Sequence, residues 1–506
     1  MADEVELKLA LPASAERAFL RHPLLKRAVG RKTETLVNLY YDTPVLDLHA
    51  RGVALRLRRQ GRRWLQTVKC AGSSAVGLST RPEWETPYGG RFDFSAVDAP
   101  KLRRRLERDR DRLAPLFETN FRRTTWRIEP APGVVLLLAR DRGWIAAAGR
   151  REEISELEIE IVRGDAAHVF RLAQELAAGL SLAPALLSKA ERGYRLFAGT
   201  PRAPVRATDV ELDPELPPLA GFRLIALDCL EHLQSNHEGA VDSDDPEYIH
   251  QMRVATRRLR AALRLFAPLL PPDLPAQLLP PLRAQMALLG AARDMDVLLD
   301  EIAAPVMKAL AAEPRLAALV GLVTERRFHH RHAAKEALRA PAFGQFVLLA
   351  GDLLHRMPEE AEAETLGAFA TRRLRRLHKK LRALAKATDV DDPRSLHALR
   401  IGIKRLRYAL EFFAPMARHG RHRAGVTTLA ELQDALGHIN DLANAGRLLG
   451  ECAGDDPRLR EAVTLIGGWH AARYTALLKS IPRGLRRLDA LRLPKLPSSH
   501  RNQESR

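Results

Sequence analysis

The sequence predicts an α+β chain in two parts, an antiparallel β-sheet or barrel followed by an all-helical half. In the first 200 residues, short runs alternate apolar and charged side chains, as where Glu4, Glu6 and Lys8 interleave with Val5, Leu7 and Leu9. Later segments repeat apolar residues every three or four positions, which is typical of helices. The proline-rich stretch 201–219 is typical of a linker, so we expect domains at 1–200 and 220–495.

Composition favours a polyanionic partner. The 506 residues carry 81 Lys and Arg against 62 Asp and Glu, a formal charge of +19. Aromatic residues make up 5% of the chain, fewer than a protein that stacks nucleic-acid bases usually needs. The three cysteines lack metal-type spacing, the N-terminus is acidic, and the apolar run 134–139 is far too short to span a bilayer. We therefore expect a cytoplasmic protein with no membrane partner.

The first strand suggests a chemical role for its charged face. Residues two apart in a strand share a face, so Glu4, Glu6 and Lys8 project together at steps of about 6.6 Å. Carboxylates can hold a divalent ion, and a lysine can meet a phosphate. A solvated strand face is the simpler interpretation of this one motif.

The same alternation recurs along the first half, and this recurrence favours a functional role over a solvated strand face. Charged side chains share a face in three more segments: Arg56 and Arg58; Arg81, Glu83 and Glu85; and Glu156, Glu158 and Glu160. In addition, Lys69 closes the predicted strand 64–69. If these faces look outward, an ordinary sandwich would suffice. If they look inward, a closed barrel has a charged lumen that can bind phosphates and metal.

These segments, in this order, resemble the CYTH domain of triphosphate tunnel metalloenzymes. The resemblance rests on Glu4-Val-Glu6-Leu-Lys8, Tyr40-Tyr41-Asp42-Thr43, Gly52-Val-Ala-Leu-Arg56-Leu-Arg58, Thr67-Val-Lys69, Arg81-Pro-Glu83-Trp-Glu85, Ser155-Glu156-Leu-Glu158-Ile-Glu160 and Ser188-Lys189. It implies an eight-stranded antiparallel tunnel that binds a triphosphate with Mg²⁺ or Mn²⁺ and hydrolyses a phosphoanhydride bond. Such chemistry asks the protein mainly for positioning and charge neutralisation.

The resemblance also implies roles for individual residues. Metal would be bound by Glu4 and Glu6 together with acids of the strand that carries Glu156, Glu158 and Glu160. Asp141 is a weaker candidate. The carried-over metal set is Glu4, Glu6, Asp141, Glu156, Glu158 and Glu160, and which of the last three reach the metal stays open. The catalytic phosphate path would be lined by Lys8, Arg56, Arg58, Lys69, Arg81 and Lys189. Arg122, or Arg123 in its place, would add a substrate contact.

The helical half contains an internal repeat. The segment from His250 to Arg260 recurs from His397 to Arg407, and 147 residues separate the two histidines. The same 147 residues separate Asp294 from its counterpart in a second matching segment, Asp441. Two equal helical units are therefore expected, at about 220–365 and 366–495.

Each repeated helix carries a row of cations on one face. A row of guanidinium groups suits a linear polyphosphate, because each can form charge-assisted bonds to phosphate oxygens. The predicted substrate contacts are His250, Arg253, Arg257, Arg258, Arg260, His397, Arg400, Lys404, Arg405 and Arg407. The alternative is a solvated helix face, on which Asp294 and Asp441 would offset the repulsion between the cations. Metal ligation by the histidines is disfavoured because no second ligand stands at the right spacing.

Residues from about 220 to 490 resemble the CHAD domain, on both His-x-x-Arg helices and both glycine-containing segments that follow them. The resemblance implies a pair of four-helix bundles related by pseudo-twofold symmetry, with a basic pore or groove that binds inorganic polyphosphate. A further group of cations stands on one predicted helix and would extend that surface or simply favour solubility: Arg372, Arg375, Arg376, Lys379, Lys380 and Arg382.

Taken together, these features favour a metal-dependent hydrolase acting on inorganic triphosphate, joined to a polyphosphate-binding helical domain. A non-catalytic protein associated with polyphosphate granules is one alternative, and thiamine triphosphatase or adenylate cyclase activity in the same tunnel is another. Non-specific nucleic-acid binding would need only the positive charge. We expect no specific nucleic-acid partner, and the oligomeric state stays open.

Overall fold

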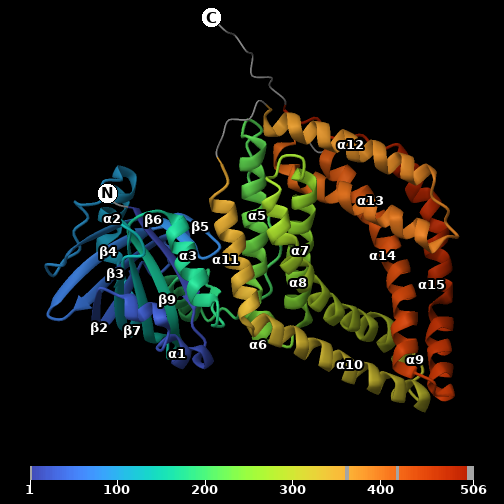
Figure 1. Cartoon of the computed structure of the whole chain (residues 1–506), viewed down its shortest axis with the longest axis horizontal. Helices are drawn as coiled ribbons and strands as arrows, with labels where there is room; N and C mark the ends of the chain where they lie inside the picture. The colour runs from blue at the N-terminus through green and yellow to red at the C-terminus, as the bar shows by residue number, and fades with distance from the viewer. Residues whose placement is uncertain (1–2, 359–363, 418–420, 498–506) are drawn as a thin grey trace, which may run out of the picture. The chain divides into compact units, whose positions relative to one another are not determined.

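The computed structural model describes residues 3–358, 364–417 and 421–497. The chain divides into two compact units, each made of two segments. The first unit comprises Met1–Pro204 and Leu338–Arg356, and the second comprises Val205–Ala337 and Met357–Arg506. Strands dominate the first unit and helices the second (Figure 1).

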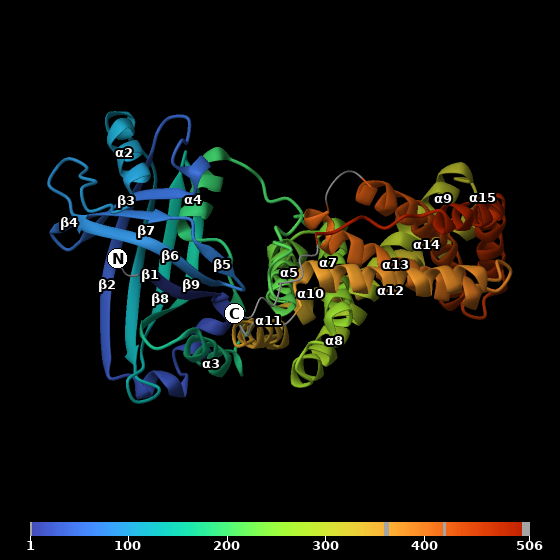
Figure 2. The ribbon, with the colours of Figure 1, turned by 90° about the horizontal axis from the view of Figure 1, so that it is seen from above.

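Eight antiparallel strands close into a barrel in the first unit, so the predicted fold class is confirmed there. Each strand pairs with the next, and the last pairs with the first. Around the barrel they are β1 (Asp3–Ala10), β9 (Arg150–Arg163), β8 (Val135–Ala147), β7 (Ala114–Ile128), β2 (Gly30–Asp42), β3 (Val53–Gln60), β4 (Arg63–Cys70) and β6 (Leu78–Pro87). Two short strands extend the sheet, β5 (Ser73–Ala75) beside β6 and β10 (Ala183–Pro184) beside β1. Figure 2 shows the strands curving around one another.

One set of apolar residues on β1 and β9 faces outward, under a helix. Leu7, Leu9, Leu157 and Ile159 are fully buried in one core cluster with Phe170 of α3 (Ala166–Ala177). Because successive side chains of a strand point to opposite faces, their charged neighbours must point into the barrel. The helices of this unit are α1 (Ala13–Phe19), α2 (Pro100–Asp109), α3 (Ala166–Ala177), α4 (Lys189–Ala198) and α11 (Pro341–His355), with short 3₁₀ turns at Pro23–Arg27, His49–Arg51 and Arg110–Arg112.

Helix α11 comes from the middle of the helical half of the sequence, yet it packs on α3 and β10 (Figures 1 and 2). Leu348 is fully buried in the core cluster that lies outside β1 and β9. Gln345 donates a 2.9 Å hydrogen bond to the carbonyl of Ala177. At Gly344 a Cβ would lie 1.7 Å from the carbonyl oxygen of Leu182, so glycine permits this close approach.

The second unit is helical, as predicted. Its helices are α5 (Pro218–Ser235), α6 (His237–Asp242), α7 (Pro246–Phe266), α8 (Asp273–Val297), α9 (Ala304–Ala309), α10 (Pro314–Arg339), α12 (Leu366–Lys386), α13 (Pro393–Phe412), α14 (Arg421–Ala453) and α15 (Pro457–Asp489), with a π-helical turn at Leu298–Ala303 and a 3₁₀ turn at Ala414–Met416. In the described ranges no single helix is long and apolar enough to cross a bilayer, although α10 and α11 taken together pass that test by length and composition alone.

The internal repeat is visible in local structure. Helix α7 begins at Pro246 after the N-cap Asp245, and α13 begins at Pro393 after the N-cap Asp392. Each aspartate accepts backbone N–H groups that the first turn leaves unpaired, and proline suits a first position that needs no donor. Phe266 and its repeat counterpart 147 residues later, Phe413, contact each other with ring centroids 6.1 Å apart. Contact between equivalent residues is what twofold-related units produce.

Candidate functional site

The charged face of β1 lines the inside of the barrel wall. Glu6 and Lys8 are 5% and 4% exposed, although both carry charge. In the register of β1 and β9, Glu6 lies opposite Glu160 and Lys8 opposite Glu158. Charged groups are rarely buried unless they are paired, so the partners of these side chains decide what the interior can do.

Lys189 stands at the centre of three buried carboxylates. It is the first residue of α4, whose N-terminus is held by the reciprocal capping box of Ser188 and Glu191. Its Nζ lies 2.6 Å from Asp141 Oδ2 and 2.9 Å from Glu158 Oε1, and it also bonds Glu156.

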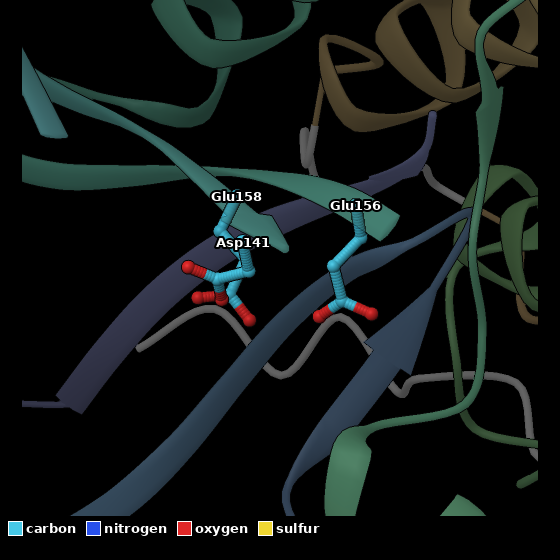
Figure 3. A group of neighbouring side chains, drawn as sticks. All are labelled: Asp141, Glu156 and Glu158. Carbon is cyan, nitrogen blue, oxygen red and sulfur yellow. The ribbon is translucent and has the colours of Figure 1, made fainter. Parts of the chain in front are cut away.

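The three carboxylates converge closely enough to hold one cation (Figure 3). One oxygen from each of Asp141, Glu156 and Glu158 lies within 4.8 Å of the others, and all three residues are buried. Burial by itself would lower the pKa of Lys189, but these three charges outweigh it and raise that pKa well above its usual value. The ammonium therefore stays protonated and neutralises the cluster.

Arg123 of β7 supports the same cluster from the neighbouring wall. Its Nε donates to Asp141 Oδ1 at 2.8 Å and its Nη2 to Oδ2 at 2.6 Å, a bidentate pair, and it also bonds Glu158. Burial would raise the pKa of Glu158, but Lys189, Lys8 and Arg123 hold it well below its usual value. Glu158 is therefore an ionised acid with its charge fully compensated.

A second set of charges lies around Glu4. Lys69 Nζ is 2.5 Å from Glu4 Oε2 and 2.9 Å from Glu83 Oε2, while Arg56 Nη2 is 3.4 Å from Glu83 Oε1. Arg81 reaches Glu6 in the same way, at 3.4 Å between Nη2 and Oε1. These cations on β3, β4 and β6 are thus held in place by acids of β1 and β6.

Arg58 is the least compensated cation of the interior. Its Nε donates to Asn38 Oδ1 at 3.0 Å, and the nearest carboxylate oxygen, on Glu85, is 3.9 Å away. Burial, followed by repulsion from Arg56 and Arg123, lowers the pKa of Arg58 to about 10. An anionic ligand would relieve this repulsion.

Glu160 is the uncompensated acid. Within the described ranges it forms neither a hydrogen bond nor an ion pair. Burial and the charges of Glu4 and Glu6 raise its pKa to about 6. Glu4 bonds Lys69, and Glu6 bonds Lys8 and Arg81, so Glu160 is the one of these three carboxylates that has no cation bound to it among the described residues. Carboxylate oxygens are the ligands that a hard divalent cation prefers.

The barrel thus gathers most of the residues singled out in the first half of the sequence. Those on its inner face are Glu4, Glu6, Lys8, Arg56, Arg58, Lys69, Arg81, Asp141, Glu156, Glu158, Glu160 and Lys189.

Arg122 is the exception and needs correction. It is exposed and shares its face of β7 with Trp126 and Ile128, which belong to the core outside the wall. The inward residue is Arg123. Sequence reasoning gave it only as the alternative, although alternation counted back from Trp126 would have selected it. Arg192 was missed altogether: its Nη1 donates to Glu156 at 3.1 Å and its Nε to Glu152 at 2.7 Å.

In the second unit, α7 and α13 bring their cations around two aspartates. Arg253 Nη2 lies 3.4 Å from Asp294 Oδ1, and Gly290 on α8 leaves room for it, since a Cβ there would lie 2.4 Å from Arg253 Nη1. Burial, followed by repulsion from Arg400 and Arg257, lowers the pKa of Lys404 to about 7. The cluster is therefore short of negative charge.

The other predicted contacts of this surface differ in their ion pairing and in their exposure. In the part of the chain that the structure describes, Arg257, Arg400 and Lys404 form no ion pair, whereas Arg407 pairs with Glu411 at 3.3 Å. His250 is half-buried, while His397 and Arg405 are exposed. The Nε atoms of Arg257, Arg260 and Arg400 are buried and lack a hydrogen-bond partner among the described residues.

Arg258 does not belong to this surface, contrary to the sequence prediction. It is 7% exposed, lies 3.1 Å from Asp228 and covers the ring of Phe412. An arginine in this position stabilises the packing of α5, α7 and α13 and has no free face for a ligand.

Comparison with known proteins finds relatives for each unit separately. The CYTH domain family matches residues 2–194, and the CHAD domain family matches residues 224–450. An inorganic triphosphatase from Haemophilus influenzae is 29% identical over 196 residues, which are 39% of this chain and 55% of that protein. The chain thus matches about half the length of that relative. The crystal structure of the CHAD domain from the plant Ricinus communis is 38% identical, with a TM-score of 0.52, over 59% of this chain and all of that one.

Proposed function

We propose that this chain, which belongs to the CYTH family through residues 2–194 and to the CHAD family through residues 224–450, hydrolyses inorganic triphosphate inside its barrel. One observation carries the proposal: the inner wall sets a row of buried cations beside an acidic group that lacks compensating charge. An ordinary sheet would keep such charges in water. The triphosphatase relative from Haemophilus influenzae supports the same activity.

The cations provide binding and orientation. Lys8, Arg56, Arg58, Lys69 and Arg81 come from four neighbouring strands and can each donate to phosphate oxygens. A bound anion should stabilise the charged form of Arg58 in particular, because it would offset the repulsion from Arg56 and Arg123. Phosphoryl transfer needs little more from a protein than a fixed in-line geometry and neutralised charge, which these side chains supply.

We assign the divalent ion, Mg²⁺ or Mn²⁺, to Glu4, Glu6 and Glu160. The fit rests on Glu160, whose raised pKa reports the excess of negative charge there. Asp141, Glu156 and Glu158 also converge, but all three bond the ammonium of Lys189, whereas Glu160 bonds no cation among the described residues. When bound, the ion neutralises charge on the phosphate oxygens of the substrate.

A substrate panel tests the proposed activity. Phosphate release from triphosphate, pyrophosphate, long-chain polyphosphate, ATP and thiamine triphosphate would be compared, with each metal in turn. Triphosphate with Mg²⁺ or Mn²⁺ should give the highest kcat/KM. A preference for thiamine triphosphate, or formation of cyclic AMP from ATP, would assign the tunnel a different substrate.

We further propose that the basic surface on α7 and α13 binds inorganic polyphosphate. Arg257, Arg400 and Lys404 support this, since they face one another with no ion-pair partners among the described residues. The lowered pKa of Lys404 reflects a site that would be relieved by an anion. Binding of long-chain polyphosphate to the full chain, compared with the Arg257→Gln/Lys404→Gln variant, tests this proposal.

A further inference from the structure

A second basic surface of the helical unit lies on α12, away from the repeated stripe. It borders a hollow of about 390 Å³ lined by Arg375, His378, Lys379, Arg382, Ala383, Lys386 and Leu493. Six of these residues belong to α12 and recur at spacings of one to four, so they share one side of the helix. Leu493, in the extended segment after α15, contributes another wall.

The cations of this groove are mostly unpaired. Arg382 bonds Asp489 at the end of α15, with Nε and Nη2 at 2.8 and 2.6 Å from the same oxygen. Arg375, Lys379 and Lys386, by contrast, form no ion pair with any residue in the described ranges. The groove therefore carries more positive charge than its one acid balances.

His378 adds a polar group without a partner. Its Nε2 is buried and forms no hydrogen bond within the part of the chain that is described. Burial and the neighbouring Arg382 lower its pKa, so the ring is neutral near pH 7. In the tautomer protonated at Nε2 it can donate to an oxygen ligand without adding charge.

The groove is distinct from the surface on α7 and α13. Leu381 and Leu384 of α12 pack toward Gly402 of α13, where a Cβ would lie 3.0 Å from each. Arg382 follows Leu381 by about 100° around the helix, and the other groove residues cluster with it on that side. The apolar face of α12 thus turns to α13, and the groove residues lie on the other side of the helix.

We propose that the α12 groove is a second anion site, which binds a run of phosphates from an inorganic polyphosphate chain. Arg375 and Lys386 are eleven residues apart, about 16 Å along a helix, so the cations form a line and not a single point. No Phe, Tyr or Trp is among the residues that line the hollow, so it lacks the large aromatic platforms on which nucleic-acid bases usually stack. The ligand class is the one proposed for the α7 and α13 surface, but no residue is shared.

The test compares two double variants of the full chain that remove equal charge from the same helix. Lys379→Gln/Lys386→Gln alters the groove, while Arg376→Gln/Lys380→Gln alters exposed positions outside its lining. Affinity for long-chain polyphosphate is measured across a salt series, and thermal melts verify that both variants fold. The groove variant should bind at least about tenfold more weakly. Its salt dependence should become shallower by about two units in log K against log salt.

Three results would overturn the site. The two variants could lose affinity equally, which would indicate general attraction to a positive surface. Single-stranded RNA could displace polyphosphate from the wild-type chain as readily as polyphosphate displaces RNA, which would indicate a nucleic-acid surface. Finally, Arg257→Gln/Lys404→Gln could abolish all binding, which would leave the α7 and α13 surface as the whole site. If instead that variant binds normally and the groove variant does not, the groove stands and the other surface fails.

Discussion

Glu6 on β1 and Glu160 on β9 are direct register partners on the inner face of the barrel wall. Side chains in such positions have Cβ atoms about 4.5–5.5 Å apart, and like charges there repel. Glu6 has Lys8 and Arg81 beside it, whereas Glu160 has no ion-pair partner in the described ranges. The repulsion therefore falls on Glu160.

Glu160→Gln should stabilise the metal-free protein at high pH. The pKa of Glu160 is raised from 4.5 to about 6 in the folded chain, so its ionisation costs stability progressively between those values. The variant should melt at a higher temperature than wild type at pH 8, and at an equal one near pH 4. With Mg²⁺ or Mn²⁺ the order should reverse, because the ion stabilises only a chain that binds it. Equal metal-induced shifts in Tm for both proteins would remove Glu160 from the metal site, and Glu107→Gln, at an exposed helix position, serves as control.

Lys189→Met should destabilise the metal-free barrel by about 3–5 kcal/mol, because it leaves the buried carboxylates Asp141, Glu156 and Glu158 short of a cation. Added Mn²⁺ should restore more stability to this variant than it adds to wild type, since the three oxygens converge on one point. Denaturant unfolding with and without Mn²⁺ measures both effects. A variant as stable as wild type without metal would show that the lysine does not neutralise the cluster.

Arg123→Gln and Arg122→Gln form a matched pair on adjacent residues of one strand. The first removes a buried guanidinium that holds Asp141 and Glu158, and the second removes an exposed one. Triphosphate hydrolysis should fall at least about 100-fold in the first and less than twofold in the second. Similar activities in the two variants would contradict the assignment of Arg123 to the interior site.

Polyphosphate binding through α7 and α13 should weaken as the pH rises from 6.5 to 8.5. The pKa of Lys404 is about 7 in the free chain, so the side chain is charged at the lower pH and largely neutral at the higher one. An anion favours the charged form, so each complex takes up a proton in this range. Lys404→Gln should bind with a flatter pH profile. If the pH profile of Lys404→Gln matched that of wild type, a group other than Lys404 would be titrating in this range.

Alternation of charge made the barrel interior predictable. Once Leu7 and Leu9 are assigned to a core, Glu6 and Lys8 must lie on the other face, and each later strand repeats the argument. The internal repeat likewise predicted that α7 and α13 are equivalent, because its offset is constant.

Three-dimensional neighbours were not predictable in the same way. The apolar pattern of α11 shows that Leu348 is buried, but not that it is buried against α3, which lies more than 160 residues earlier in the sequence and in the same unit. The resemblance assigned Lys189 to the phosphate path, and only the closed barrel shows that three carboxylates surround its ammonium. Arg258 and its repeat counterpart Arg405 look alike in sequence, yet Asp228 pairs only the first of these two.

The central claim, that the charges inside the barrel carry out catalysis, is tested most directly by phosphate release from inorganic triphosphate with Mg²⁺ or Mn²⁺. The full chain would be compared with Glu6→Gln and Lys8→Ala variants, whose folding is verified by thermal melts. We predict rapid release by wild type and a loss of at least about 100-fold in each variant. Undiminished release by folded Glu6→Gln and Lys8→Ala chains would contradict the account.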